Sequence, residues 1–171
     1  TLAVSLASGA FAATYSNWFK SNYQEMQNLK ILPDQFTGMD LKQPITRGEM
    51  CLLAVQAFEE ATGNDLELDG TQYFTDTNDT NITKAYEYGI VSGYPDGTFR
   101  PDARITRAEA MTMINRVLCR MPQSESDLLD SMVTWPDNKP SDWHYLAVQE
   151  ATNSHDFNRQ GEVGESWTKL T

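Results

Sequence analysis

The chain has 171 residues and is acidic, with 24 Asp and Glu against 13 Lys and Arg and a formal net charge of −11 at pH 7. This charge argues against a nucleic-acid partner, because phosphate backbones are bound by clustered basic side chains. Hydrophobic residues make up 40% of the chain, which is enough for a folded core at this length. No apolar run approaches the ~18 residues that a transmembrane helix needs, so no transmembrane segment is expected.

The first thirteen residues are mostly small and apolar. Ala10-Phe11-Ala12 fits the cleavage rule of a secretory signal peptide, but the positively charged start of such a signal is missing. Two interpretations of residues 1–13 therefore stay open: the remnant of a signal peptide, or an Ala-rich segment that packs on a neighbour.

Apolar spacing and end signals predict four helices in the next part of the chain, over residues 15–30, 46–61, about 82–88 and 106–121. In the first helix, Phe19, Tyr23 and Met26 form the apolar stripe. Gly63 and Gly89 are expected to close the second and third helices, and Pro122 to stop the fourth.

The remaining elements are weaker. Pro95-Asp96-Gly97 predicts a turn, with short β pieces expected at 93–94 and 98–99. Residues 124–133 are a link with one or two helical turns. Ser141 is expected to cap a fifth helix whose inward residues are Trp143, Leu146, Ala147 and Ala151. Residues 153–171 give no clear prediction.

One sequence box occurs twice, sixty residues apart, as ITRGE at 45–49 and ITRAE at 105–109. The apolar positions that follow the two boxes have the same offsets, which indicates an internal repeat. The Thr and Glu of each box have the spacing of a helix capping box. Arg47 and Arg107 are not explained by capping, because a cation is unfavourable at a helix N-terminus. Each arginine is expected to bind either an external anion or a neighbouring acidic side chain.

The run GIVSGYPDGTFRP at 89–101, followed by the second box, resembles the S-layer homology (SLH) domain. The resemblance is long and specific over 74–121, weaker in a first repeat, and partial at the end, where no third box follows. It implies an all-α fold with minor short β in the loops, built as a pseudo-threefold bundle of three SLH helix-loop-helix repeats. The expected repeats are residues 14–63, 71–122 and a divergent third at 133–171.

The resemblance also implies a function and a site. SLH domains anchor exported proteins to the Gram-positive cell wall by binding anionic secondary cell-wall polymers, often pyruvylated, in grooves between repeats. The positions that match the family's groove residues are Arg47, Arg107, Gly89, Gly93, Asp76, Asp137 and Trp143. The expectation is a non-catalytic, secreted carbohydrate-binding module of the cell surface. The alternative is a scaffold of the same fold that self-assembles or docks a protein partner without binding polymer.

Other constellations point to no catalytic set, cofactor or metal. The stretch from Asp76 to Glu87 has some ligand types of a calcium loop, but Lys84 stands where a carbonyl or water ligand is needed. His144 and His155 lie without a matched nucleophile and are interpreted as hydrogen-bonded structural residues. The repeat places Cys51 and Cys119 on different helix faces, which favours free thiols over a disulfide. Five arginines between 100 and 120 suggest either a local basic patch or a solvated helix face.

Overall fold

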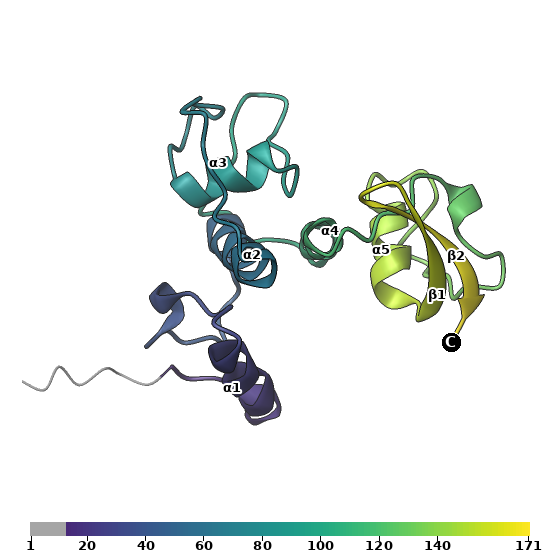
Figure 1. Cartoon of the computed structure of the whole chain (residues 1–171), viewed down its shortest axis with the longest axis horizontal. Coiled ribbons are helices and arrows are strands. Elements are labelled where there is room, and N and C mark those ends of the chain that lie inside the picture. Colours follow the sequence, from purple (N-terminus) through teal and green to yellow (C-terminus); the bar gives the residue numbers. More distant parts are fainter. Residues whose placement is uncertain (1–12) are drawn as a thin grey trace, which may run out of the picture.

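The computed structural model describes residues 13–171 (Figure 1). The predicted signal remnant at 1–13 therefore lies, except for Ala13, outside the described residues. The helices are η1 (Asn17–Phe19), α1 (Lys20–Asn28), η2 (Asp34–Phe36), α2 (Arg47–Thr62), α3 (Thr80–Glu87), α4 (Arg107–Val117), η3 (Glu125–Asp127) and α5 (Tyr145–Thr152). The strands are β1 (His155–Gln160) and β2 (Gly164–Leu170), which pair in one antiparallel sheet.

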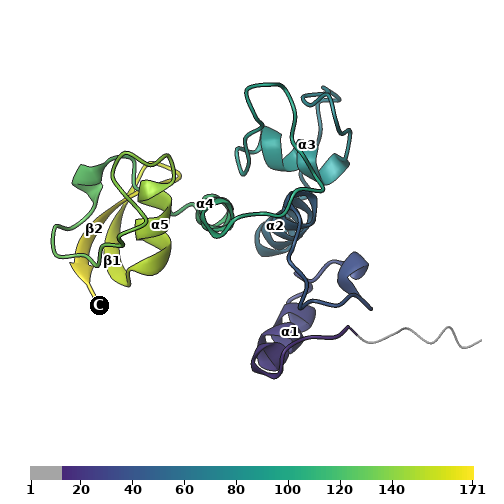
Figure 2. The ribbon, with the colours of Figure 1, turned by 180° about the vertical axis from the view of Figure 1, so that it is seen from behind.

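The helices pack across the boundaries of the predicted repeats. Helix α2 contacts both α3 and α4, and α4 contacts α5. In Figure 1, α4 is seen end-on between α2 and α5, and Figure 2 shows the same order from behind. The two box helices α2 and α4 thus lie between three outer segments, which carry α1, α3, and α5 with the hairpin.

The prediction of an all-α fold is wrong, because residues 155–170 form a β-hairpin. Gly161 sits in its turn with φ +66°, a conformation that glycine adopts without strain. Along β2, Glu165 and Trp167 are buried while Thr168 and Lys169 are exposed, so one end of the strand faces a core. The predicted pseudo-threefold bundle is not confirmed either. Within residues 13–171, this hairpin follows α5 in the predicted third repeat, where the first two repeats have a box helix.

The two box helices begin as the capping-box spacing predicts. In α2, the Glu49 amide donates to the Thr46 hydroxyl at 3.1 Å, and the Thr46 amide donates to the Glu49 carboxylate at 2.8 Å. Thr106 and Glu109 repeat this pattern in α4. The segments leading into the two boxes also pair with each other, since the Arg47 amide donates to Ala103 and the Ile105 amide to Ile45. This pairing sets the starts of α2 and α4 side by side.

Several helix ends and faces differ from the predictions. Helix α2 ends at Gly63 with φ +69°, as expected, but α4 ends at Val117, well before Pro122. The chain leaves α4 through Cys119, which has a left-handed φ of +53°. The expected short β pieces at 93–94 and 98–99 are a turn, closed by the Tyr94 amide on the Thr98 carbonyl at 2.9 Å.

Helix α5 departs from the predicted amphipathic pattern. It begins after His144, and the Ser141 side chain does not cap it. Trp143 is 69% exposed and Ala151 is exposed, so neither points inward. The buried side of α5 is formed by Tyr145, Gln149 and Glu150. A face with two polar residues out of three cannot be identified from hydrophobic spacing.

The buried side chains form two clusters. The larger joins α2, α3 and α4 with the segment 90–99 and includes Val55, Ile82 and Phe99. The smaller contains Leu128, Tyr145 and Trp167, below the hairpin. Cys51 is fully buried in the larger cluster, and both cysteines are free thiols.

Candidate binding grooves

Two grooves lie beside the two box helices. The first groove has a volume of about 230 Å³ and is lined by Arg47, Val91, Ser92, Gly93, Tyr94, Glu109, Thr112, Met113, Arg116 and Trp143. The second groove has a volume of about 460 Å³ and is lined by Arg107, Ala108, Met111, Trp135, Asp137, Asn138, His144, Val148 and Thr152. Each groove therefore combines the arginine of one box with residues of later segments.

Arg47 is held rigidly at the wall of the first groove. It is 7% exposed, its Nε donates to the Phe99 carbonyl at 3.0 Å, and its Nη1 lies 2.5 Å from Oε1 of Glu109. The guanidinium also lies over the rings of Tyr94 and Phe99, 4.9 Å and 4.6 Å from their centroids. Of the two expectations for Arg47, the structure shows the acidic neighbour, with the groove beside it.

Glu109 connects the two boxes. Burial acts to raise its pKa, but hydrogen bonds from the Thr106 amide and hydroxyl and the nearby Arg47 charge outweigh that effect and lower it. Glu109 is therefore a carboxylate that caps α4 and neutralises the arginine at the start of α2. The pair crosses the groove wall between the two predicted repeats.

Arg116 gives the first groove a second guanidinium. Its Nη1 donates to the Ile90 carbonyl at 3.2 Å, and burial lowers its pKa. Within residues 13–171 it forms no salt bridge, so its remaining donors have no acidic partner there. Trp143 lines the same groove with its indole largely in solvent. In the sequence, Arg116 belongs only to a basic stretch, and the apolar offsets shared by the two boxes gave no reason to single it out.

Two predicted site residues have clear structural reasons for their identity. A Cβ at Gly93 would lie 2.3 Å from a ring carbon of Phe74, so only glycine fits at this part of the first groove. Gly89 has φ +71° after α3 and lines neither groove. The first glycine is required by packing and the second by backbone conformation.

Asp76 also lines neither groove. Its two carboxylate oxygens accept the amides of Phe99 and Arg100, each at 2.8 Å. These bonds lower the pKa of Asp76 and fix Arg100 in a left-handed conformation with φ +60°. Asp79, which lies within the calcium-like stretch between Asp76 and Glu87, accepts the amides of Asn81 and Ile82 and so caps α3.

The second groove has a different charge arrangement. Arg107 is exposed, and its guanidinium forms no salt bridge or hydrogen bond within the described part of the chain. Asp137 and Trp135 line the same groove, and the Trp135 indole donates to Thr152 at 2.9 Å. His144 is hydrogen-bonded through Nδ1 to the Asn138 side chain at 3.0 Å. Arg107 is therefore an open guanidinium beside an aromatic surface.

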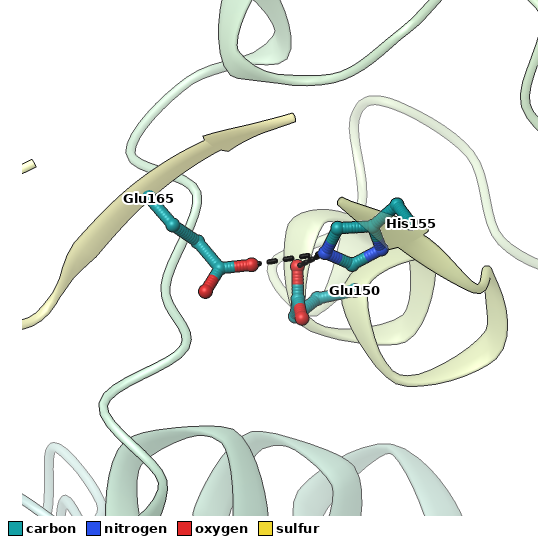
Figure 3. Close-up of side chains that lie close together, drawn as sticks. All are labelled: Glu150, His155 and Glu165. Carbon is teal, nitrogen blue, oxygen red and sulfur yellow. Dashed lines mark hydrogen bonds and ion pairs between the residues drawn. The ribbon is translucent and has the colours of Figure 1, made fainter. Parts of the chain in front are cut away.

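A third group was not predicted from the sequence. Glu150, His155 and Glu165 converge between the hairpin and α5 (Figure 3), with one ligand-type atom from each within 4.8 Å of the others. The three residues lie on α5, β1 and β2, so their proximity depends on the hairpin that sequence analysis did not foresee. No spacing rule for metal ligands covers such a set.

The fold and grooves define a small module built from repeats, in which two similar helices present arginines to clefts between segments. Residues 75–111 match the family model "S-layer homology domain", which confirms the resemblance predicted from the sequence. The matched segment includes α3, the 89–101 loop and the start of α4, and so one wall of the first groove. No helix within residues 13–171 is both long and apolar enough to cross a bilayer.

Curated relatives resemble parts of this chain. Cell surface glycoprotein 1 of Acetivibrio thermocellus is 35% identical over 52% of the chain and 4% of its own length. The cellulosome-anchoring protein of the same organism is 32% identical over 66% of the chain and 25% of its own length. The surface layer protein of Brevibacillus choshinensis is 32% identical over 64% of the chain and 10% of its own length. The chain thus spans a quarter or less of each of these relatives.

Proposed function

We propose that this chain is a non-catalytic module that anchors a protein at the cell surface by binding an anionic cell-wall glycopolymer. The observation that carries the proposal is that each groove sets a box arginine beside an indole from the segment before α5. Arg47 and Trp143 line the first groove, and Arg107 and Trp135 line the second. A guanidinium and an aromatic face together suit an acidic sugar, which offers a carboxylate and apolar ring faces.

The three groove arginines differ in whether an acidic side chain already pairs with them, and their proposed roles differ accordingly. Arg47 is committed to Glu109, so in the first groove Arg116 would bind the acidic group while Arg47 fixes the wall. In the second groove, Arg107 would bind it directly. Gly93 and Trp143 would shape the first groove and Asp137 the second, while Asp76 and Gly89 would hold the loop that forms the groove wall.

The relatives support the coarser part of this proposal. Two of them are named as surface proteins and one as an anchoring protein, which supports a cell-surface location. The similar segment is a small part of each relative, which fits a module joined to larger proteins. Acidic chemistry of the polymer, including pyruvylation, is the finer proposal and is supported by the two grooves.

A wall-binding assay tests the proposal. The chain should be retained by native cell-wall sacculi and not by sacculi stripped of secondary polymer. Arg107→Ala and Arg116→Ala should each reduce retention, and together they should abolish it, because the affinity comes from two pockets acting on one polymer. Arg104→Ala is the matched control, since Arg104 is also exposed but lines neither groove. Equal retention of the unmodified chain and all four variants would refute the grooves as the binding sites.

A second candidate function is the scaffold without polymer binding. One observation favours it: the hairpin replaces the third box helix, so the described chain has only two box arginines. A chain that ignores native sacculi but forms a defined oligomer by light scattering would support the scaffold. A monomer that binds sacculi would exclude it.

A further inference from the structure

The side chains of the cluster between the hairpin and α5 are fully enclosed. The side chains of Glu150, His155 and Glu165 are 0% exposed. Nε2 of His155 lies 3.0 Å from Oε1 of Glu165 and 3.3 Å from Oε2 of Glu150 (Figure 3). Buried carboxylates are costly unless a cation or hydrogen-bond donors compensate their charge.

The hydrogen bond made by Nδ1 of His155 determines which nitrogen of the neutral ring carries the proton. Nδ1 of His155 lies 2.8 Å from the Asn153 carbonyl, which can only accept, so Nδ1 carries a proton. In the neutral ring, Nε2 then points a lone pair at two carboxylate oxygens. Three electron-rich atoms then converge on one point, so either a cation or a proton on Nε2 has to lie between them.

We propose that Glu150, His155 and Glu165 form a binding site for a divalent metal ion of the zinc class. Tetrahedral zinc has ligand atoms about 2.0–2.1 Å away, and therefore about 3.4 Å from one another. The two distances from Nε2 are close to this value. An imidazole nitrogen with two carboxylates favours zinc or a similar transition metal over calcium or magnesium, which prefer sets of oxygen atoms.

The surroundings resemble those of a metal-binding histidine. The Nδ1 bond to a backbone carbonyl fixes the ring with Nε2 free to ligate. The Trp167 indole donates to Oε2 of Glu150 at 2.7 Å and stacks on the imidazole, with centroids 4.1 Å apart. Oε2 of Glu165 is buried and has no hydrogen-bond partner among the described residues. This carboxylate is thus incompletely satisfied by the protein.

Arg120 is the other charged group that faces the cluster. Its Nη2 lies 2.6 Å from Oε1 of Glu150 and 3.5 Å from Nε2 of His155, and its Nε lies 4.0 Å from Oε2 of Glu165. One guanidinium against two carboxylates leaves a net charge of −1 when the imidazole is neutral. A proton on Nε2 would also compensate this charge, and that is the competing explanation that the experiment must separate.

The experiment uses the full chain, stripped with a chelator and then offered Zn²⁺ or Co²⁺, both in the folded state and during refolding from denaturant. Refolding is included because the ligands are enclosed and a metal can enter most easily as the hairpin closes. One equivalent should remain after desalting, measured by elemental analysis. Zinc at about 100 times its Kd should raise the melting temperature by about 5–10 °C. The Co²⁺ spectrum should lack thiolate charge-transfer absorption, because no cysteine is in the set.

The chain offers a matched control, since it has two histidines. His155→Gln should lose the bound equivalent, and His144→Gln should keep it. Glu165→Gln, which preserves shape, tests the site if His155→Gln does not fold. Retention of metal by both His155→Gln and Glu165→Gln would overturn the proposal. So would a wild-type chain that binds no metal on either route and shows, by nitrogen NMR, a His155 ring protonated at both nitrogens.

Discussion

Arg47 and Arg107 occupy the same position of the same box, but the structure gives them different environments. Arg47 is buried against Glu109, the glutamate of the next box. By the same rule, Arg107 would need the glutamate of a third box, and the described chain has a hairpin there instead. The exposure of Arg107 is therefore a consequence of the divergent third segment. The identity of each arginine was predictable from the sequence, but its partner depended on the following repeat.

This difference predicts unequal effects on stability. Arg47→Ala leaves Glu109 partly buried without its cation, and it should lower the free energy of unfolding by about 3–5 kcal/mol. Arg107→Ala removes an exposed side chain and should change it by no more than about 0.5 kcal/mol. Urea denaturation of the three proteins measures both values. Similar stabilities for the two variants would contradict the buried ion pair.

The two cysteines should differ in reactivity. Burial raises the pKa of the Cys51 thiol to about 12, so almost no thiolate forms at pH 8. A thiol reagent at that pH should leave Cys51 unmodified in the folded chain and modify both cysteines in denaturant. Mass spectrometry after proteolysis identifies the modified residue. Rapid labelling of Cys51 in the native chain would mean that the larger core opens readily.

The hydrogen bonds that Asp96 accepts in the loop beside the first groove should be lost only in strong acid. Hydrogen bonds from the Thr98 side chain and Arg100 lower the pKa of Asp96 to about 2. A lowered folded-state pKa stabilises the fold above the unfolded value near 4, and this contribution is lost as the pH falls towards 2. Carboxyl NMR should therefore show Asp96 titrating near pH 2. A midpoint near 4 would mean that the Thr98 and Arg100 bonds do not persist in solution.

At the scale of elements, the loop that follows α3 is constrained by its packing against Phe74. Gly93→Ala would push a methyl group into that ring, and it should cost about 1–3 kcal/mol of stability. Ser92→Ala, at an exposed neighbour, is the control and should be nearly neutral. Thermal denaturation compares the two. A neutral Gly93→Ala would show that the Phe74 ring moves away at little cost.

Comparison of the observed helices and strands with the predicted ones shows which sequence signals were sufficient to predict an element. Helices α1 to α4 were predicted because apolar spacing, capping boxes and closing glycines are local signals. The hairpin was not predicted, since β1 is almost entirely exposed and carries no alternating pattern. Helix α5 was found, but its inward face was wrong, because Gln149 and Glu150 are buried by hydrogen bonds and ion pairs rather than by apolar contacts.

At the scale of the whole molecule, the sites depend on contacts between distant residues. The Arg47–Glu109 pair spans 62 positions, and the group around His155 combines a helix with both strands of the hairpin. The family resemblance indicated the box arginines and the loop glycines. It could not indicate Arg116, because the hydrogen bond from its guanidinium to the Ile90 carbonyl depends on how α4 packs. It could not indicate the buried cluster either, because that cluster lies in the segment that departs from the family pattern.

From the net charge we predict how the proposed wall binding depends on salt concentration. A chain with net charge −11 repels an anionic polymer at long range, whereas the groove arginines attract it at contact. The Debye length falls from about 30 Å at 0.01 M salt to about 8 Å at 0.15 M and about 3 Å at 1 M. Retention on sacculi should therefore rise from 0.01 M to about 0.15 M salt, as the general repulsion is screened, and fall towards 1 M, as the arginine contacts weaken. Arg107→Ala should flatten the fall without removing the rise, while Arg104→Ala should leave the fall in place. A steady decrease from the lowest salt would show that the net charge does not oppose binding, and would place the acidic side chains away from the path of the polymer.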